Sequence, residues 1–144
     1  MNNDIIFFKE VVFLDLNKKV AFVTGASIGL GKGLIEELSK NGCNVIIGYN
    51  KSKEKAEWLK KNIEEKYNVK ALSVKCDVTD ENSIKNTITY IVDNFGKIDI
   101  VINNAAYAQD NYIYDKTKEE FMKVLETNLV GPFLVSKYAY KYMN

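Results

Sequence analysis

The sequence predicts an α/β fold: a doubly wound parallel sheet with its strands in the order 3-2-1-4. Short apolar segments alternate with amphipathic helical segments, and strands recur at intervals of about 25 residues. A glycine-rich turn joins the first strand to the first helix, and the fourth strand is almost wholly apolar, as expected for a strand covered on both faces. Right-handed crossovers give the strand order and place a binding site at the carboxyl ends of the strands, between strands 1 and 4.

The first two strand–helix units follow a short extension. Residues 1–13 form this extension, and residues 20–23 form the first strand. The first helix is expected to run to about residue 40 and to stop at Gly42, because glycine suits the end of a helix. Residues 44–49 are the second strand, and Ser52 is placed to cap the second helix.

The second half begins with a third strand at 71–74 and a third helix at 81–95, closed by Gly96. The fourth strand is predicted at 98–102. A long helix follows from Thr117, which forms a capping box with Glu120 and continues toward the end of the chain. The apolar face of this helix is expected to contain Phe121, Val124, Leu125 and Leu129.

The turn after the first strand has the composition of a phosphate-binding loop. Its glycines stand at positions 25, 29, 31 and 33, and Ser27 adds a hydroxyl donor. Glycines let backbone and anion approach closely, and the unpaired amides of a first helical turn point at the charge. The spacing matches neither the P-loop nor the pattern G-x-G-x-x-G. An ordinary glycine-rich turn is the alternative.

The remaining pattern, Thr24-Gly25-x-x-x-Gly29-x-Gly31, resembles the cofactor turn T-G-x-x-x-G-x-G of the short-chain dehydrogenase/reductase family. The resemblance covers nearly all of residues 14–144, which correspond to the amino-terminal half of a complete family member. It implies a partial Rossmann-type domain over residues 1–144 that binds a nicotinamide dinucleotide. The residues of the turn that it assigns to the cofactor are Gly25, Ser27, Ile28, Gly29, Leu30 and Gly31.

The end of the second strand indicates which dinucleotide is bound. Asn50, Lys51 and Ser52 offer hydrogen-bond donors at a helix start. Proteins that bind NAD usually place a carboxylate here, which accepts from the ribose 2′-hydroxyl and would repel a 2′-phosphate. No carboxylate occurs before Glu54, so the sequence favours NADP, with NAD as the alternative. For Lys51, an ordinary solvated lysine is the simpler interpretation.

The third and fourth strand ends also match the family. Asp77 and Val78 correspond to an Asp-Val pair that contacts the adenine, although Asp77 alone would be explained as the start of a loop. Residues 103–106 read N-N-A-A where the family has N-N-A-G. The resemblance assigns three of these residues to the cofactor, namely Asn104, Ala105 and Ala106. The added methyl of Ala106 is expected to reduce the clearance beneath the ribose or to shift the cofactor slightly.

Asn128 matches the catalytic asparagine of the family, whose backbone carbonyl holds a water in a proton relay. Pro132 has no amide to bond that carbonyl, which leaves it free. A simple proline kink is the alternative. The other catalytic groups of the family, a serine and a Tyr-x-x-x-Lys, have no match at the expected place. Three Tyr-x-x-x-Lys pairs begin at Tyr49, Tyr112 and Tyr114, but all precede Asn128 and are expected by chance.

Composition excludes several other functions. The formal net charge is +1, so neither nucleic acid nor an anionic membrane is expected as the main partner. No apolar segment is long enough to span a membrane or resembles a signal peptide, which favours a cytoplasmic location. The absence of histidine excludes Ser-His-Asp catalysis and most zinc sites, so no metal is expected. Cys43 and Cys76 are expected to be buried thiols.

The resemblance implies an NADP-dependent reductase of a small carbonyl or alcohol substrate, similar to 3-oxoacyl-acyl-carrier-protein reductases, with glucose as the alternative substrate. This chain alone is expected to be inactive, because the serine and the Tyr-x-x-x-Lys are unmatched. A non-enzymatic dinucleotide-binding module and a gene remnant are the rival hypotheses. The complete family member is expected to be a homo-oligomer, and the unpaired edge of the fourth strand favours pairing between chains.

Overall fold

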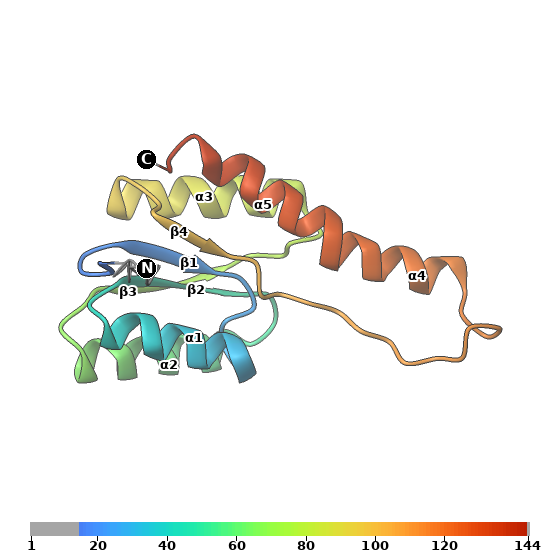
Figure 1. Cartoon of the computed structure of the whole chain (residues 1–144), viewed down its shortest axis with the longest axis horizontal. Helices are drawn as coiled ribbons and strands as arrows, with labels where there is room; N and C mark the ends of the chain where they lie inside the picture. Colours follow the sequence, from blue (N-terminus) through green and yellow to red (C-terminus); the bar gives the residue numbers. More distant parts are fainter. Residues whose placement is uncertain (1–14, 144) are drawn as a thin grey trace, which may run out of the picture.

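The computed structural model describes residues 15–143 and shows a parallel sheet between two layers of helices (Figure 1). The strands are β1 (Val20–Val23), β2 (Asn44–Tyr49), β3 (Ala71–Lys75) and β4 (Ile100–Ile102). Their order is β3-β2-β1-β4, which confirms the predicted order and leaves β4 at one edge of the described sheet. The expected extension at 1–13 lies outside the described residues.

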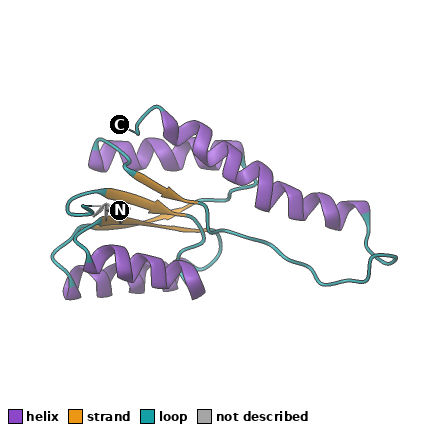
Figure 2. Ribbon diagram, viewed as in Figure 1, coloured by secondary structure: helices purple, strands orange, loops and turns teal. Residues whose placement is uncertain are grey.

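Helices cover both faces of the sheet (Figure 2). They are α1 (Gly29–Lys40), α2 (Lys53–Lys66), α3 (Glu81–Phe95), α4 (Lys118–Leu125), the π-helical segment η1 (Glu126–Val130) and α5 (Gly131–Tyr140). Helices α1 and α2 lie on one face, and α3 and α5 lie on the other (Figure 1). Helix α4 continues the line of α5 beyond the sheet, so its sides are less covered than those of the other helices (Figure 1).

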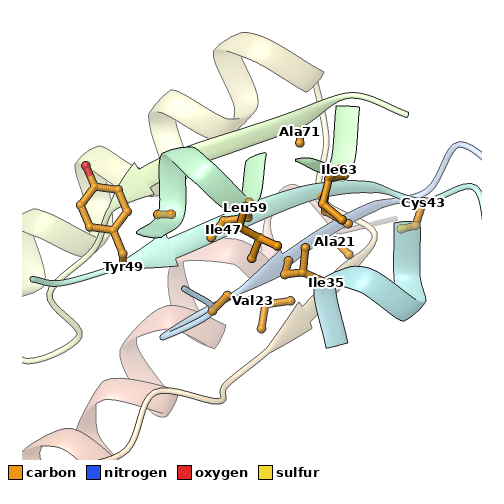
Figure 3. Packing of buried hydrophobic residues seen from close by; sticks show 12 residues of the cluster. Ala21, Val23, Ile35, Cys43, Ile47, Tyr49, Leu59, Ile63 and Ala71 are labelled. Carbon is orange, nitrogen blue, oxygen red and sulfur yellow. The ribbon is translucent and has the colours of Figure 1, made fainter. Parts of the chain in front are cut away.

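Alternate residues of the central strands enter two separate cores, because successive side chains of a strand point to opposite faces. Ala21 and Val23 of β1 and Ile47 of β2 pack against α1 and α2 (Figure 3). Phe22 and Ile46 pack with the residues of α3 and α5. All five side chains are fully buried. Burial on both faces is the reason that these strands are continuously apolar.

Several element boundaries differ from the sequence-based expectation. β4 begins at Ile100 rather than at residue 98, because the Ile98 N–H bonds to the Tyr142 carbonyl at 3.1 Å and is not used in the sheet. Ile98 is still fully buried in the core beneath α5. β3 extends one residue further than predicted, to Lys75.

Most helix ends follow the expected chemistry. Gly96 ends α3 with a left-handed φ of +76°, and Thr117 and Glu120 form the predicted capping box at α4. Gly42 follows the last residues of α1 with a φ of +82°, one position beyond the C-cap. Ser52 occupies the N-cap position of α2, but its side chain makes no capping hydrogen bond to any described residue.

The long helix predicted from Thr117 contains a wider π-helical turn and ends at Tyr140. At this turn, the Gly131 N–H bonds to the Glu126 carbonyl, five residues earlier. Pro132 has no N–H for the Asn128 carbonyl, and its ring would clash with that carbonyl in a regular helix, so the wider turn accommodates it. The expected apolar face is largely uncovered by residues 15–143, since Phe121 and Leu129 are exposed.

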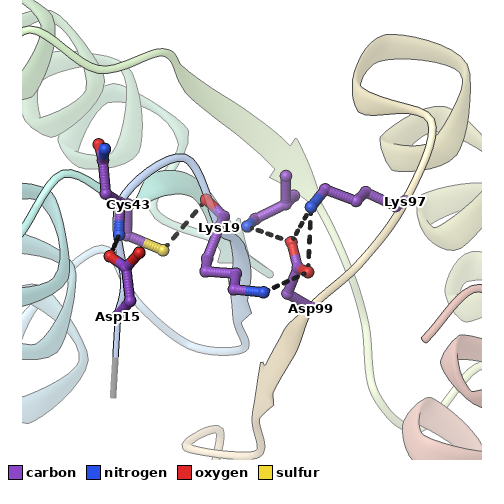
Figure 4. Close-up of polar contacts among 7 residues, drawn as sticks. Asp15, Lys19, Cys43, Lys97 and Asp99 are labelled. Carbon is purple, nitrogen blue, oxygen red and sulfur yellow. Dashed lines mark hydrogen bonds and ion pairs between the residues drawn. The ribbon is translucent and has the colours of Figure 1, made fainter. Parts of the chain in front are cut away.

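Asp99 joins the amino ends of β1 and β4, whereas the predicted site lies at the carboxyl ends of the strands (Figure 4). Its carboxylate accepts a hydrogen bond from the Val20 N–H at 2.8 Å and pairs with Lys97 at 2.9 Å. Lys19 lies 3.6 Å away on the other side. Burial by itself would raise the pKa of Asp99, but the hydrogen bonds from Lys97 and from the Val20 amide lower it below its usual value.

Candidate functional site

The predicted site residues gather at the carboxyl ends of the four strands. A cleft of about 920 Å³ opens there between the sheet edge and helix α4, a volume typical of small-molecule sites. Sequence-predicted residues that line this cleft are Gly25, Ile28, Asn50, Lys51, Asp77, Val78, Asn104, Ala105 and Ala106. Gly29, Leu30, Gly31, Ser52 and Asn128 are not among its lining residues, and Ser27 lines a smaller neighbouring pocket.

The glycine turn presents open backbone at the start of α1. Gly29 has a φ of +58°, and apart from its chain neighbours and the backbone of its own helix, no atom of the described residues lies within 4 Å of the position that a Cβ would occupy. The N-cap residue Ile28 provides no side-chain hydrogen bond within the described structure, so the first amides of α1 keep their donor capacity. Open space beside a helix N-terminus fits an anionic group such as a pyrophosphate.

Gly25 and Gly31 serve a different purpose, which is close packing beneath the turn. A Cβ at Gly25 would lie 2.9 Å from the Cα of Ala105, and Gly25 itself has a φ of +61°. A Cβ at Gly31 would lie 2.5 Å from the side-chain nitrogen of Asn104 and 2.8 Å from the Ala26 Cα. These two glycines therefore allow the turn and the end of β4 to pack closely, whereas Gly29 leaves open space in which an anionic group fits.

Thr24 connects the glycine turn to the end of β4. Its hydroxyl accepts hydrogen bonds from the backbone amides of Asn104 and Ala105, each at 3.0 Å. The Asn104 side chain donates in return to the carbonyls of Thr24 and Gly25, both at 3.0 Å. Thr24 is the first residue of the sequence motif, but sequence reasoning does not place it among the site residues. Its position in the motif is the signal that could have found it.

The end of β2 contributes polar groups to the opposite side of the cleft. Asn50 and Lys51 are exposed and line the cleft, and Ser52 lies at the first turn of α2. Between the end of β2 and Glu54, the residues that line the cleft have no carboxylate group. The Lys51 ammonium and the Asn50 side-chain amide are hydrogen-bond donors, and they suit a phosphate group better than they suit an uncharged ribose hydroxyl.

Asp77 is held as a charged hydrogen-bond acceptor at the end of β3. Burial by itself would raise the pKa of Asp77, but hydrogen bonds from the hydroxyl and amide of Thr79, together with the Asn50 side chain, lower it below its usual value. The Thr79 hydroxyl lies 2.7 Å from Asp77 Oδ1. The amide of Asp77 donates to Ser83 at 2.9 Å, which fixes the loop at the start of α3. The carboxylate can therefore accept a donor from a ligand without a change in protonation at neutral pH.

Asn128 holds the segment that follows β4. Its side-chain oxygen accepts from the Tyr107 N–H at 2.8 Å, and its side-chain nitrogen donates to the Tyr107 carbonyl at 2.9 Å. The Asn128 side chain is thereby occupied by the Tyr107 backbone. Lys123 lies 4.4 Å from the centre of the Tyr107 ring and stabilises the same contact from α4.

One wall of the cleft was missed by sequence reasoning. It consists of residues of α4, of the turn after it and of the segment after β4, namely Tyr107, Glu119, Met122, Lys123, Glu126 and Thr127. No motif in the sequence marks these residues, because the direction of α4 relative to the sheet depends on packing.

The two cysteines are free and buried, as expected. Burial raises the pKa of the Cys43 thiol to about 11, and the Asp99 charge adds to this effect. Burial likewise raises the pKa of Cys76, beside Asp77, to about 11. Both thiols therefore remain protonated at neutral pH, and neither is suited to nucleophilic chemistry.

A doubly wound sheet with a glycine turn at its switch point defines a nucleotide-binding α/β protein. A family model described as short chain dehydrogenase matches residues 19–144, and the chain belongs to this family. The 3-oxoacyl-[acyl-carrier-protein] reductase FabG of Staphylococcus aureus is 37% identical over 115 residues, which are 80% of this chain and 46% of the relative. The corresponding reductase of Buchnera aphidicola is 35% identical over 83% of this chain and 47% of its own length.

Solved structures show the same arrangement. A short chain dehydrogenase from Burkholderia cenocepacia in complex with NADP has a TM-score of 0.86 and 28% identity, over 91% of this chain and 53% of that one. A blue fluorescent protein from a metagenomic library in complex with NADPH has a TM-score of 0.84 and 26% identity, over 90% of this chain and 53% of that one. The chain thus spans about half the length of the proteins that it matches. None of the helices within residues 15–143 is long and apolar enough to cross a membrane.

Proposed function

We propose that this chain binds NADP(H) in the cleft at the carboxyl ends of its strands. The observation that carries the proposal is the open glycine turn, in which Gly29 leaves free space directly beside the amides that begin α1. Ile28, Gly29 and Leu30 would face the pyrophosphate, because a helix N-terminus favours negative charge, and Gly25 and Gly31 would support this part of the turn by packing against the end of β4. The complexes of structural relatives with NADP and NADPH support the same ligand class.

The other strand ends would hold the adenosine and ribose parts of the cofactor. Asp77 and the Val78 backbone are placed to meet the adenine, and Asn104 to Ala106 would lie beneath the nicotinamide ribose. Ala106 is exposed at the cleft, so its methyl would reduce clearance without disturbing the core. Asn50, Lys51 and Ser52 would meet a 2′-phosphate, which is why we propose NADP(H) rather than NAD(H).

The activity that we propose for the protein to which this chain belongs is reduction of a carbonyl group, with a 3-oxoacyl thioester as the substrate class. This rests on the 35–37% identity to 3-oxoacyl-[acyl-carrier-protein] reductases. The dinucleotide, when bound, supplies the hydride. The backbone carbonyl of Asn128, which Pro132 cannot engage with an N–H, would hold a water for proton transfer. No Tyr-x-x-x-Lys follows Asn128 within the 144 residues, so this chain by itself would bind the cofactor without turnover.

Titration with NADPH tests the binding proposal, using Gly29→Val and the matched control Gly96→Val. Both glycines have positive φ, +58° and +76°, and beyond the adjacent backbone no described atom lies within 4 Å of either added Cβ. Both substitutions therefore impose similar backbone strain, but only Gly29 lies in the turn. We expect Gly29→Val to abolish NADPH binding measured by calorimetry and Gly96→Val to retain it. Equal affinities in the two variants would refute the assignment.

A further inference from the structure

Gly131 brings the start of α5 into direct contact with the loop that follows β3. Its backbone is helical, with a φ of −55° and a ψ of −56°, a conformation that any residue with a side chain could adopt. A Cβ at this position would nevertheless lie 2.9 Å from the Val78 carbonyl oxygen and 3.0 Å from the Val78 Cβ. The reason for glycine here is therefore space and not backbone conformation.

Helix α5 is the more firmly held partner in this contact. Val135 and Ala139, about one and two turns beyond Gly131, are fully buried in the core on the sheet face that α3 and α5 cover. The loop has less cover, since Asp77 is half-buried and Thr79 is exposed. A methyl group added at Gly131 would therefore displace the loop rather than the helix, because moving the helix would disturb the core.

This loop is the one to which the proposed function assigns the adenine. Asp77 and Val78 both line the large cleft. The Val78 N–H makes no hydrogen bond to residues 15–143, so it can donate to a ligand. The Asp77 carbonyl accepts from the Asp80 N–H at 3.1 Å, and the Asp77 carboxylate accepts from the Thr79 N–H at 3.0 Å. These bonds close a compact turn around Val78, so a shift of Val78 also moves Asp77.

We propose that Gly131 is a positioning residue for recognition of the adenine ring. This inference rests on the proposed function, because it assumes a dinucleotide in the large cleft. The adenine amino group is a donor that suits the Asp77 carboxylate, and the neighbouring ring nitrogen is an acceptor that suits the Val78 N–H. Hydrogen bonds weaken steeply when distance and angle depart from their optimum. The close approach of α5, which the missing side chain of Gly131 permits, therefore sets the strength of both contacts.

Calorimetric titration with NADPH and with its hypoxanthine analogue tests the role of Gly131, using Gly131→Ala. Hypoxanthine has a carbonyl oxygen in place of the amino group and an N–H in place of the ring acceptor, so it can make neither contact. We expect the unmodified chain to prefer NADPH by about tenfold or more, as for a hydrogen bond to a charged group. In Gly131→Ala the preference should fall to about twofold, because NADPH loses the aligned contacts and the analogue has none to lose.

Ala139→Gly is the matched control for a general change in α5. It exchanges the same two residue types in the reverse direction, about 12 Å further along the helix. The change removes a buried methyl group and lowers helix propensity, so the midpoint of urea denaturation should fall. We expect Ala139→Gly to keep the full preference for NADPH over the analogue, because the contact between Gly131 and Val78 is intact.

Val78→Ala tests the same contact from the loop side and decides the question if Gly131→Ala does not fold. It keeps the Val78 backbone but removes packing between the loop and α5, so the preference for NADPH should fall about threefold. In the double variant, the methyl at residue 131 gains the room of the Val78 Cγ2, 3.1 Å away, so the two losses should add up to less than their sum.

The outcomes separate this inference from the proposed function. An unchanged preference in Gly131→Ala, or in Val78→Ala where the first variant does not fold, overturns the inference and leaves NADP(H) binding intact. Equal losses for NADPH and the analogue also overturn it, because they indicate a general structural effect. Equal affinities of the unmodified chain for the two ligands would remove the adenine contacts and this inference with them. Failure of the unmodified chain to bind NADPH overturns both proposals.

Discussion

Thr24 and Asn104 bind each other in both directions across the switch point of the sheet. The Thr24 hydroxyl accepts from the Asn104 N–H at 3.0 Å, and the Asn104 side chain donates to the Thr24 carbonyl at 3.0 Å. The two residues are 80 positions apart in the sequence. Because Thr24 is 1% exposed, these bonds are shielded from water and determine how the glycine turn sits over the end of β4.

Replacing Thr24 with valine should therefore destabilise the fold. Valine has the same shape but leaves the Ala105 amide without its acceptor, at a cost of about 1–3 kcal/mol, while the Asn104 amide keeps its hydrogen bond to the Ile102 carbonyl. Urea denaturation followed by circular dichroism measures the change in the free energy of unfolding. Thr24→Ser, which keeps the hydroxyl, is the control. If valine and serine had the same effect, the hydroxyl would not be the stabilising group.

Gly31→Ala and Gly33→Ala should act in opposite directions. An added Cβ at Gly31 would lie 2.5 Å from the side-chain nitrogen of Asn104 and 2.8 Å from the Gly25 carbonyl oxygen, so the turn or β4 must shift. At Gly33, an added Cβ would have no described atom within 4 Å beyond the adjacent helix backbone, and alanine should stabilise α1 by about 0.5–1 kcal/mol through its helix propensity. Chemical denaturation of both variants measures the difference. Stabilisation by Gly31→Ala would contradict the close packing of Gly31 against Asn104.

Asp99 should make stability depend on pH in the acid range. Its pKa is lower in the folded protein than in the unfolded chain, so its contribution is present above the unfolded value of about 3.9 and is lost as the pH falls through the folded value. Asp99→Asn should therefore lower the free energy of unfolding at pH 7 by about 1 kcal/mol or more and flatten the decline below pH 4.

The exposed Asp93 of α3 provides the control for this pH series, because it has no ion pair with any residue in the part that the structure describes. Asp93→Asn should change the stability at pH 7 little, because the Asp93 side chain is exposed. The role assigned to Asp99 would be wrong if the two variants gave parallel curves.

Asn50→Asp should shift cofactor preference toward NADH. The new carboxylate would face the 2′-phosphate and would also lie near the Asp77 carboxylate, whose lowered pKa depends in part on Asn50. The ratio of NADPH to NADH affinities is the measurement, and it should fall about tenfold or more, since the change replaces a donor with a like charge. A ratio equal to that of the unmodified chain would show that the ribose is bound elsewhere.

The 144-residue chain alone should not reduce a 3-oxoacyl thioester with NADPH above background. A carbonyl that accepts hydride also needs a proton donor, and general acid catalysis contributes about a hundred- to ten-thousand-fold. The Asn128 side chain is occupied by Tyr107, and its carbonyl cannot donate a proton. Absorbance at the NADPH band measures turnover. Robust activity would mean that another group of this chain is the acid and that the active site is misplaced.

Periodicity and local chemistry made much of the fold predictable. The strand order, the two helical layers and the caps at Gly96 and Thr117 all follow from apolar patterns, crossover handedness and single-residue preferences. The glycine turn was predictable for the same reason, because its spacing is local. The β4 boundary was not, since the Ile98 N–H is used by the Tyr142 carbonyl, far along the chain.

The sequence by itself determined the class of fold, the four strand ends that meet at the cleft and the family to which the chain belongs. Only the tertiary structure showed that Thr24 joins two of those ends, that α4 forms a wall of the cleft, and that Ser27, Lys32 and Trp58 line a separate pocket. The reason is physical. Periodic patterns specify which face of an element is apolar, whereas the distance between side chains on different elements depends on sheet register and helix packing.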